Sequence, residues 1–164
     1  MDKDAVVGFL PHRPPFLFID SVKEVSPAQA VLDDPETADT RKLVGTKVIS
    51  EFEVRSDLEI LAGHFPGNPI LPGVVQIEMM AQCSAFTSLA LKSLNKEKVK
   101  VETLLISVEK SKFRKPILPG MKLEIHAQMS KCRGNIASYE CFINCNGEKV
   151  SEAAFLAKLE VVTK

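Results

Sequence analysis

Residues 63–78 read GHFPGNPILPGVVQIE. This stretch joins one imidazole, His64, to one carboxyl group, Glu78, through three prolines and two glycines. From residue 65 to residue 91 Glu78 is the only charged side chain, and the residues after Gly73 are apolar nearly all round a helix. Other elements have to enclose a helix of this kind. The sequence therefore predicts one main helix over residues 73–94, with Pro72 at its start and residues 95–98 ending it in solvent.

The rest of the chain is rich in strand signals. Period-two alternation predicts a half-buried strand over residues 46–54, with Val48, Phe52 and Val54 on one face. The polar segment 26–43 is expected to be a loop, with a strand near residues 28–32. The dipeptide Asn146-Gly147 predicts a hairpin turn of the primed type. Further strands are expected over residues 18–25, 101–113, 121–131, 136–144 and 149–161. Strands, one buried helix and then an antiparallel meander indicate an α+β fold, a curved antiparallel sheet around a central helix.

Composition limits the class of protein. A chain of 164 residues with 45 % hydrophobic side chains suits a single domain, residues 1–164, with a substantial core. A net charge of +0 and a pI near 6.8 argue against a general nucleic-acid-binding protein. We expect no signal peptide and no membrane span. Cysteines 83, 132, 141 and 145 show neither CxxC nor metal-ligand spacing, so we expect reduced packing thiols, no metal site and a cytoplasmic location.

His64 and Glu78 form a plausible acid–base pair. Apolar surroundings favour the neutral form of a carboxyl group, and a neutral imidazole can accept a proton. Such a pair suits removal of water next to a carbonyl: His64 takes the α-proton and Glu78 helps the β-hydroxyl leave. The backbone N–H of Gly73 or Val74, at the positive end of the helix dipole, suits the developing enolate oxygen. Structural roles for both side chains are the alternative.

The other two histidines and a basic cluster have simpler interpretations. His12 is expected to make a structural contact and His126 to occupy a surface position. The cluster consists of Lys110, Lys112, Arg114 and Lys115. It is either a solvated edge that discourages strand pairing or a docking face for an acidic partner.

Residues 64–82, HFPGNPILPGVVQIEMMAQ, resemble the active-site signature of the FabZ-type (3R)-hydroxyacyl-[acyl-carrier-protein] dehydratases of bacterial type II fatty-acid synthesis. Residues 10–20, LPHRPPFLFID, and residues 112–120, KFRKPILPG, agree with the same family and in the same order. The resemblance implies a hot-dog fold and a homodimer, often assembled as a trimer of dimers. It also implies that His64 of one protomer meets Glu78 of the other.

The resemblance further implies how substrate binds. The Gly73 N–H would polarise the thioester carbonyl, the acyl chain would lie in an apolar interface tunnel, and the basic cluster would face the acidic acyl carrier protein. Candidate tunnel residues are Phe65, Ile70, Leu71 and Val74. No metal or redox cofactor is expected. Two departures stand out: residues 26–46 form an insertion, and Met79 replaces the usual Ala, which could alter tunnel width.

Two rival functions share the fold. An acyl thioesterase would need a carboxylate or activated water set against the thioester carbon. A non-catalytic module that binds acyl carrier protein or an acyl chain would need neither His64 nor Glu78. Fold alone does not separate these possibilities. Chain-length preference, the dedicated pathway and the choice between dimer and hexamer stay open.

Overall fold

The computed structural model describes residues 1–93 and 99–163, so the helix end expected at residues 94–98 lies outside the described part. Among the described helices, none is both long and apolar enough to cross a membrane. The elements, in chain order, are α1 (Lys3–Phe9), β1 (Ser21–Ser26), α2 (Gln29–Leu32), the 3-10 helix η1 (Thr40–Leu43), β2 (Lys47–Glu53), α3 (Glu59–Ala62), α4 (Gly73–Ala85), the 3-10 helix η2 (Phe86–Ala90), β3 (Val99–Phe113), β4 (Lys122–Arg133), β5 (Ile136–Cys145) and β6 (Glu148–Thr163).

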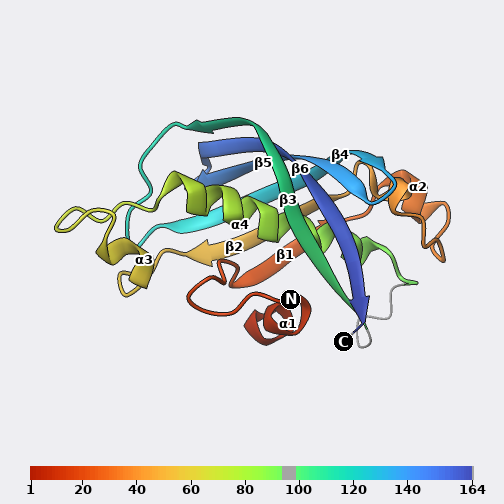
Figure 1. The fold of residues 1–164 in the computed structure, drawn as a ribbon, viewed down its shortest axis with the longest axis horizontal. Coiled ribbons are helices and arrows are strands. Elements are labelled where there is room, and N and C mark those ends of the chain that lie inside the picture. Colours follow the sequence, from red (N-terminus) through yellow and green to blue (C-terminus); the bar gives the residue numbers. More distant parts are fainter. Residues whose placement is uncertain (94–98, 164) are drawn as a thin grey trace.

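A six-stranded antiparallel sheet in the order β1-β2-β4-β5-β6-β3 curves around α4 (Figure 1). The α+β prediction is confirmed, and β4, β5 and β6 form the expected meander. The strand β3 does not join that meander next to β4, however. Both sides of β4 are occupied, by β2 and by β5, so β3 pairs with the free side of β6. As a result β3 is an edge strand, which matters for the site described below.

The prediction of one continuous α-helix to residue 94 is wrong. The α-helix ends at Ala85 and the chain continues as the 3-10 turn η2. Three hydroxyls explain the change, because each donates to the carbonyl three residues earlier: Ser84 to Ala81 at 2.7 Å, Thr87 to Ser84 at 2.8 Å and Ser88 to Ala85 at 2.8 Å. Side chains that bond to carbonyls of the preceding turn disturb regular α-helical geometry.

The strand expected near residues 28–32 is also wrong, because this segment is the helical turn α2. Ala28 and Val31 are buried while Leu32 is 55 % exposed, so burial follows a spacing of three and not of two. The turn starts after Pro27, and the Ala28 N–H donates to the hydroxyl of Thr46 at 3.1 Å. Within the segment 26–46, Val31 and Leu43 belong to the core, so this segment packs onto the sheet and is not a free loop.

Other local predictions are confirmed. Val48, Phe52 and Val54 are at most 1 % exposed, as the alternation of β2 indicates. Asn146 and Gly147 have φ of 51° and 79°, which is the primed hairpin turn. The four cysteines are free. Burial raises the pKa of Cys83 to about 12, so this thiol is a poor nucleophile.

Asp20 connects the N-terminal segment to the sheet. Its carboxylate accepts hydrogen bonds from Lys3 at 2.6 Å and from the Glu53 N–H at 2.9 Å, and Arg55 lies 3.3 Å away. Partial burial raises the pKa of Asp20, but the two hydrogen bonds and the charges of Lys3 and Arg55 outweigh it and leave the pKa below its ordinary value. The ionised carboxylate therefore stabilises the fold.

Replacing Asp20 tests this connection. Asp20→Asn should lower the free energy of unfolding by about 1–2 kcal/mol at neutral pH. Because the folded-state pKa is depressed, the contribution is full above the unfolded-state pKa and disappears as the pH falls through the folded-state value. Urea unfolding should show the largest difference from wild type at pH 7 and a smaller difference at about pH 3, below the ordinary pKa of an aspartate. Asp57→Asn, at an exposed turn position, is the control.

Met79, the departure from the family pattern, lies in the core with no exposed surface. Met79→Ala should therefore cost about 2–5 kcal/mol of unfolding free energy, because it leaves a cavity that the packed core closes only in part. Denaturant titration measures this cost, and Leu32→Ala, at a half-exposed side chain, should change it far less. A Met79→Ala chain as stable as wild type would show that the core refills the space.

Candidate active site

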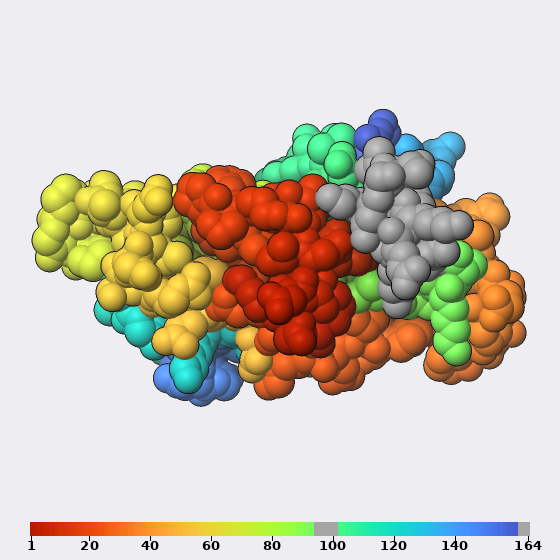
Figure 2. All heavy atoms as spheres, turned by 90° about the horizontal axis from the view of Figure 1, so that it is seen from below, coloured from red at the N-terminus to blue at the C-terminus, as the bar shows by residue number. Residues whose placement is uncertain are grey.

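The loop that carries His64 follows α3 and projects at one end of the molecule (Figure 2). Backbone hydrogen bonds fix its shape: the His64 N–H donates to Leu61 at 3.2 Å and the Ile70 N–H donates to the His64 carbonyl at 2.8 Å. The Phe65 ring stacks on the His64 ring with centroids 4.1 Å apart. The stacked Phe65 ring and the backbone bonds of His64 thus hold the imidazole in place, although the loop projects away from the core.

One contact decides which nitrogen of His64 can act as a base. His64 Nδ1 lies 2.9 Å from the carbonyl oxygen of Ile70. A carbonyl can only accept a hydrogen bond, so the neutral imidazole carries its hydrogen on Nδ1. The lone pair is then on Nε2, which points away from this contact and is available to take a proton.

Glu78 lies in the second turn of α4, with its side chain 23 % exposed. Two groups contact the same carboxyl oxygen: Gln82 Nε2 donates to Oε1 at 2.9 Å, and His12 Nε2 lies 3.2 Å from Oε1. Among the described residues no hydrogen bond reaches Oε2. One oxygen of the carboxyl group is therefore held and the other is left for a substrate.

Gln82 fixes α4 to the N-terminal segment. Its Oε1 accepts the Phe18 N–H at 2.9 Å, and its Nε2 donates to the Phe16 carbonyl at 2.9 Å as well as to Glu78. Since only an amide oxygen can accept from a backbone N–H, the orientation of this amide is unambiguous. The sequence pattern does not single out Gln82 and predicts only a structural contact for His12. The signal for Gln82 was its position four residues after Glu78 on the same helix face.

The N-terminus of α4 presents free donors. The Val75 and Gln76 N–H groups donate to the Pro72 carbonyl, at 3.1 Å and 3.2 Å, whereas no described residue accepts from the N–H groups of Gly73 and Val74. The Phe113 ring of β3 lies over Gly73, so closely that an added Cβ would meet its atoms at 2.9–3.1 Å. Glycine is required here for close approach and leaves the first two amides of the helix exposed to a ligand.

The predicted tunnel residues differ in their exposure to solvent in the single chain. Phe65 is 52 % exposed and Val74 is 74 % exposed, while Ile70 is half-buried. Leu71 is 1 % exposed and belongs to the core of the single chain. Within one chain no described hydrogen bond or ion pair joins His64 to Glu78, and the imidazole beside Glu78 is His12.

The basic cluster lies on and after β3. Arg114 pairs with Glu152 at 2.6 Å, and Lys115 pairs with Glu148. Lys110 and Lys112 are exposed and have no acidic partner among the described residues. The net positive charge of the cluster therefore comes mainly from these two lysines.

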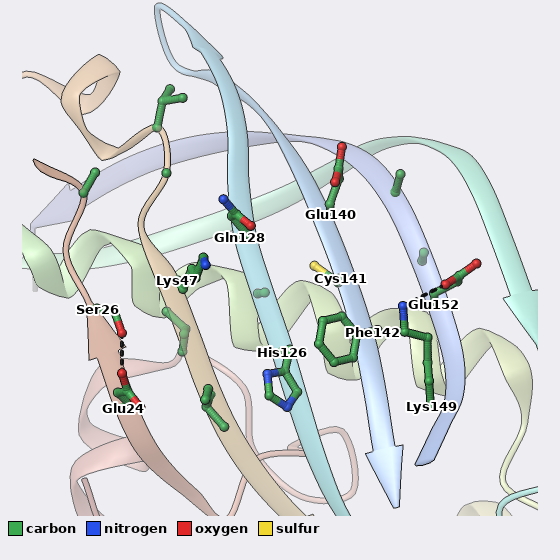
Figure 3. A pocket seen from close by; sticks show the side chains of 18 of the residues that line it. Glu24, Ser26, Lys47, His126, Gln128, Glu140, Cys141, Phe142, Lys149 and Glu152 are labelled. Carbon is green, nitrogen blue, oxygen red and sulfur yellow. Dashed lines mark hydrogen bonds and ion pairs between the residues drawn. The ribbon is translucent and has the colours of Figure 1, made fainter. Parts of the chain in front are cut away.

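A hollow of about 1390 Å³ lies elsewhere, on the face of the sheet that points away from α4 (Figure 3). Its wall includes His126, whose ring stacks on Phe142 with centroids 4.3 Å apart and whose Nε2 lies 2.7 Å from Glu124. The expected surface position of His126 is thus on this outer face, half-buried. Neither His64 nor Glu78 lines the hollow, and no group of three side chains among the described residues could hold a metal ion.

Comparison with known proteins agrees with the resemblance. The family model for ApeI-like proteins, described as ApeI dehydratase, matches residues 40–154. A 3-hydroxyacyl-[acyl-carrier-protein] dehydratase FabZ from an Anaeromyxobacter species is 35 % identical over 161 residues, which is 97 % of this chain and 90 % of the relative. The FabZ of a Wolbachia from Brugia malayi is 36 % identical over 155 residues, 94 % of each chain.

Solved structures share the fold. The dehydratase heterocomplex ApeI:P from Xenorhabdus doucetiae aligns with a TM-score of 0.67 at 20 % identity, over 94 % of this chain and 90 % of that chain. The fluoroacetyl-CoA thioesterase FlK aligns with a TM-score of 0.58 at 10 % identity, over 71 % of this chain and 87 % of that chain. At these identities the neighbours show the hot-dog fold alone, whereas the relatives that match almost end to end are dehydratases. This chain belongs to the family of FabZ-type 3-hydroxyacyl-[acyl-carrier-protein] dehydratases and is a hydro-lyase.

Proposed function

We propose that the chain removes water from a (3R)-hydroxyacyl thioester carried by acyl carrier protein, with His64 as the base and Glu78 as the acid. The observation that supports these roles best is the hydrogen bond from His64 Nδ1 to the Ile70 carbonyl, because it leaves a basic lone pair on Nε2. The names of the curated relatives support the substrate, a 3-hydroxyacyl group on acyl carrier protein.

The reaction follows from these two groups. His64 Nε2 takes a proton from the carbon next to the thioester carbonyl, and the electrons of that C–H bond form the new C=C bond. The C–O bond at the next carbon breaks, and its oxygen takes the proton from Glu78 and leaves as water. His64 is then protonated and Glu78 is a carboxylate, so one proton must pass back before the next turnover. The N–H groups of Gly73 and Val74 can stabilise the enolate oxygen that develops meanwhile.

We further propose that the site is completed across a homodimer. The strand β3 has β6 on one side and no described strand on the other. It exposes large apolar side chains, including Leu104, Ile106 and Phe113, and Val74 at the start of α4 is exposed as well. A long apolar edge strand is unusual in a monomer and pairs readily with a second copy. Such a dimer would let the projecting loop of one protomer bring His64 to Glu78 of the other, and a trimer of such dimers is compatible with this arrangement.

The same interface would hold the acyl chain. Phe65, Ile70 and Val74 leave apolar surface uncovered in the single chain, and a second protomer would enclose it as a tunnel. Leu71, already buried, would support the tunnel wall from behind. Outside it, Lys110 and Lys112, with the paired Arg114 and Lys115, would attract the acidic carrier protein.

Ultraviolet absorbance with a trans-2-enoyl thioester on acyl carrier protein tests the reaction in its reverse direction. We expect loss of conjugation without release of free thiol. His64→Ala and Glu78→Gln should each slow it at least about 100-fold, because each removes one proton-transfer group. His126→Ala, on the outer face, is the matched control and should retain wild-type rate. Release of free thiol would instead identify a thioesterase, and saturable binding without turnover would identify a binding module.

Mixing two inactive variants tests the shared site. In a dimer of His64→Ala with Glu78→Gln, one site combines both mutated positions and the other has both wild-type residues. Random exchange of subunits should therefore restore about a quarter of wild-type activity, since half the dimers are mixed and each has one intact site. If His64 and Glu78 act within one chain, the mixture stays as inactive as its components.

A further inference from the structure

We propose that His12 is a positioning residue for the reaction: it donates a hydrogen bond from Nε2 to Oε1 of Glu78, so that Oε2 is the oxygen that gives its proton to the substrate. This inference rests on the proposed role of Glu78 as the acid. Its starting point is the 3.2 Å separation between His12 Nε2 and Glu78 Oε1, together with the 2.9 Å hydrogen bond from Gln82 to the same oxygen.

The chemistry of two donors on one oxygen supports this assignment. In a neutral carboxyl group, an oxygen that accepts two hydrogen bonds uses both lone pairs of the carbonyl oxygen, so the hydrogen lies on the other oxygen. Gln82 must donate here, because its own oxygen is taken by the Phe18 N–H. If His12 also donates, the proton of Glu78 is confined to Oε2, which no described residue contacts.

The surroundings of His12 can accommodate the form with hydrogen on Nε2. In that form Nδ1 carries a lone pair and needs a donor, and Nδ1 is buried without a partner. His12 lines a space of about 10 Å³. Seven other residues line the same space, and Glu78 is the titratable one among them: Leu10, Pro11, Glu78, Ala81, Gln82, Ala85 and Thr103. That volume is near the minimum for a single water molecule.

Thr103 is the side chain in this space that can supply the donor. Both amide hydrogens of Gln82 are used, by Phe16 and by Glu78; Glu78 faces Nε2 of His12, and the other lining side chains besides Thr103 are apolar. The Thr103 hydroxyl is itself buried without a partner, so it can donate toward Nδ1, directly after a small shift or through one water. Thr103 of β3 would therefore pair with Nδ1 while Nε2–H of His12 donates to Glu78, and this donation would set the proton position of Glu78.

The segment that carries His12 is itself fixed. The Arg13 guanidinium donates to the carbonyls of Leu10 and His12, at 2.9 Å and 2.6 Å. Prolines stand at positions 11, 14 and 15 around it. A stiff turn therefore presents the imidazole to a carboxyl group that Gln82 holds, which is the arrangement that a positioning role requires.

Steady-state kinetics of three His12 variants test the proposal. His12→Phe keeps a planar ring but removes the donor, and we expect kcat to fall about 10–100-fold while KM changes little. His12→Gln places an amide N–H near the former Nε2 and should restore most of kcat. His126→Phe removes the other half-buried histidine that faces a glutamate and should leave both constants unchanged. A His12→Phe enzyme with wild-type kcat, or one whose loss lies in KM alone, would overturn the proposal.

A second pair of variants covers the case in which His12→Phe does not fold. Thr103→Val removes the hydroxyl at nearly constant volume and should lower kcat several-fold, whereas Thr103→Ser keeps the hydroxyl and should not. Equal kcat in the two variants would contradict the role given to Thr103 in fixing His12.

Nitrogen-15 NMR of the imidazole rings separates this proposal from the proposed function, because it needs no turnover. The chain has three histidines, so His64→Ala and His126→Phe assign the spectrum. We expect hydrogen on Nε2 of His12. A His12 ring with hydrogen only on Nδ1 would overturn the inference even if the enzyme is an active dehydratase. Conversely, an inactive protein with the expected tautomer would refute the proposed function and leave the contact to Glu78 standing.

Discussion

The fold depends on enclosing α4, a helix that is apolar on almost every side. Its contacts extend to β2, β3, β4, β5 and β6, so the sheet has to curve around it and cannot lie flat against one face. This constraint also determines where the polar residues of the helix must find partners. Gln82, 1 % exposed, satisfies all of its hydrogen-bonding groups through Phe16, Phe18 and Glu78. The segment 10–20 therefore closes the one side of α4 that the sheet leaves open, and in doing so it brings His12 to the acid.

The same enclosure explains why the single chain looks incomplete at one end. The first turn of α4 and the edge strand β3 both leave apolar side chains in solvent, and the His64 loop projects at one end of the molecule (Figure 2). The core residues elsewhere are almost fully buried, so this exposed apolar surface stands out. Large exposed apolar patches in soluble proteins mark interaction sites. The incomplete end, the free amides of Gly73 and Val74 and the basic Nε2 of His64 all occur together. Together these features favour a site shared between two protomers over a site within one chain.

Much of this could be predicted from the sequence, and the failures have physical causes. Period-two alternation and the Asn146-Gly147 turn gave the strands and the hairpin, because these signals are local. The end of α4 was mispredicted because hydroxyl bonding by Ser84, Thr87 and Ser88 is not visible in hydropathy. The place of β3 depends on which edges are already occupied, which is a property of the whole sheet. His12 was missed because 66 residues separate it from Glu78, and no local pattern reports a contact over that distance.

His12 and His64 make different local contacts, and these contacts suit the two rings for opposite tasks. Nδ1 of His64 is hydrogen-bonded to a carbonyl, so Nε2 carries the lone pair when the ring is neutral. At Nε2 the neutral ring can therefore only accept a proton. His12 faces Glu78 with Nε2 and has a hydroxyl as the available neighbour of Nδ1, so its ring can donate to the carboxyl group and leave it protonated on the far oxygen. In the proposed mechanism His64 acts on the substrate carbon and His12 acts on Glu78, so the two rings do not compete for one group. For His64 the carbonyl partner of Nδ1 supports the role of base, and for His12 the contact of Nε2 with Glu78 supports the role of donor.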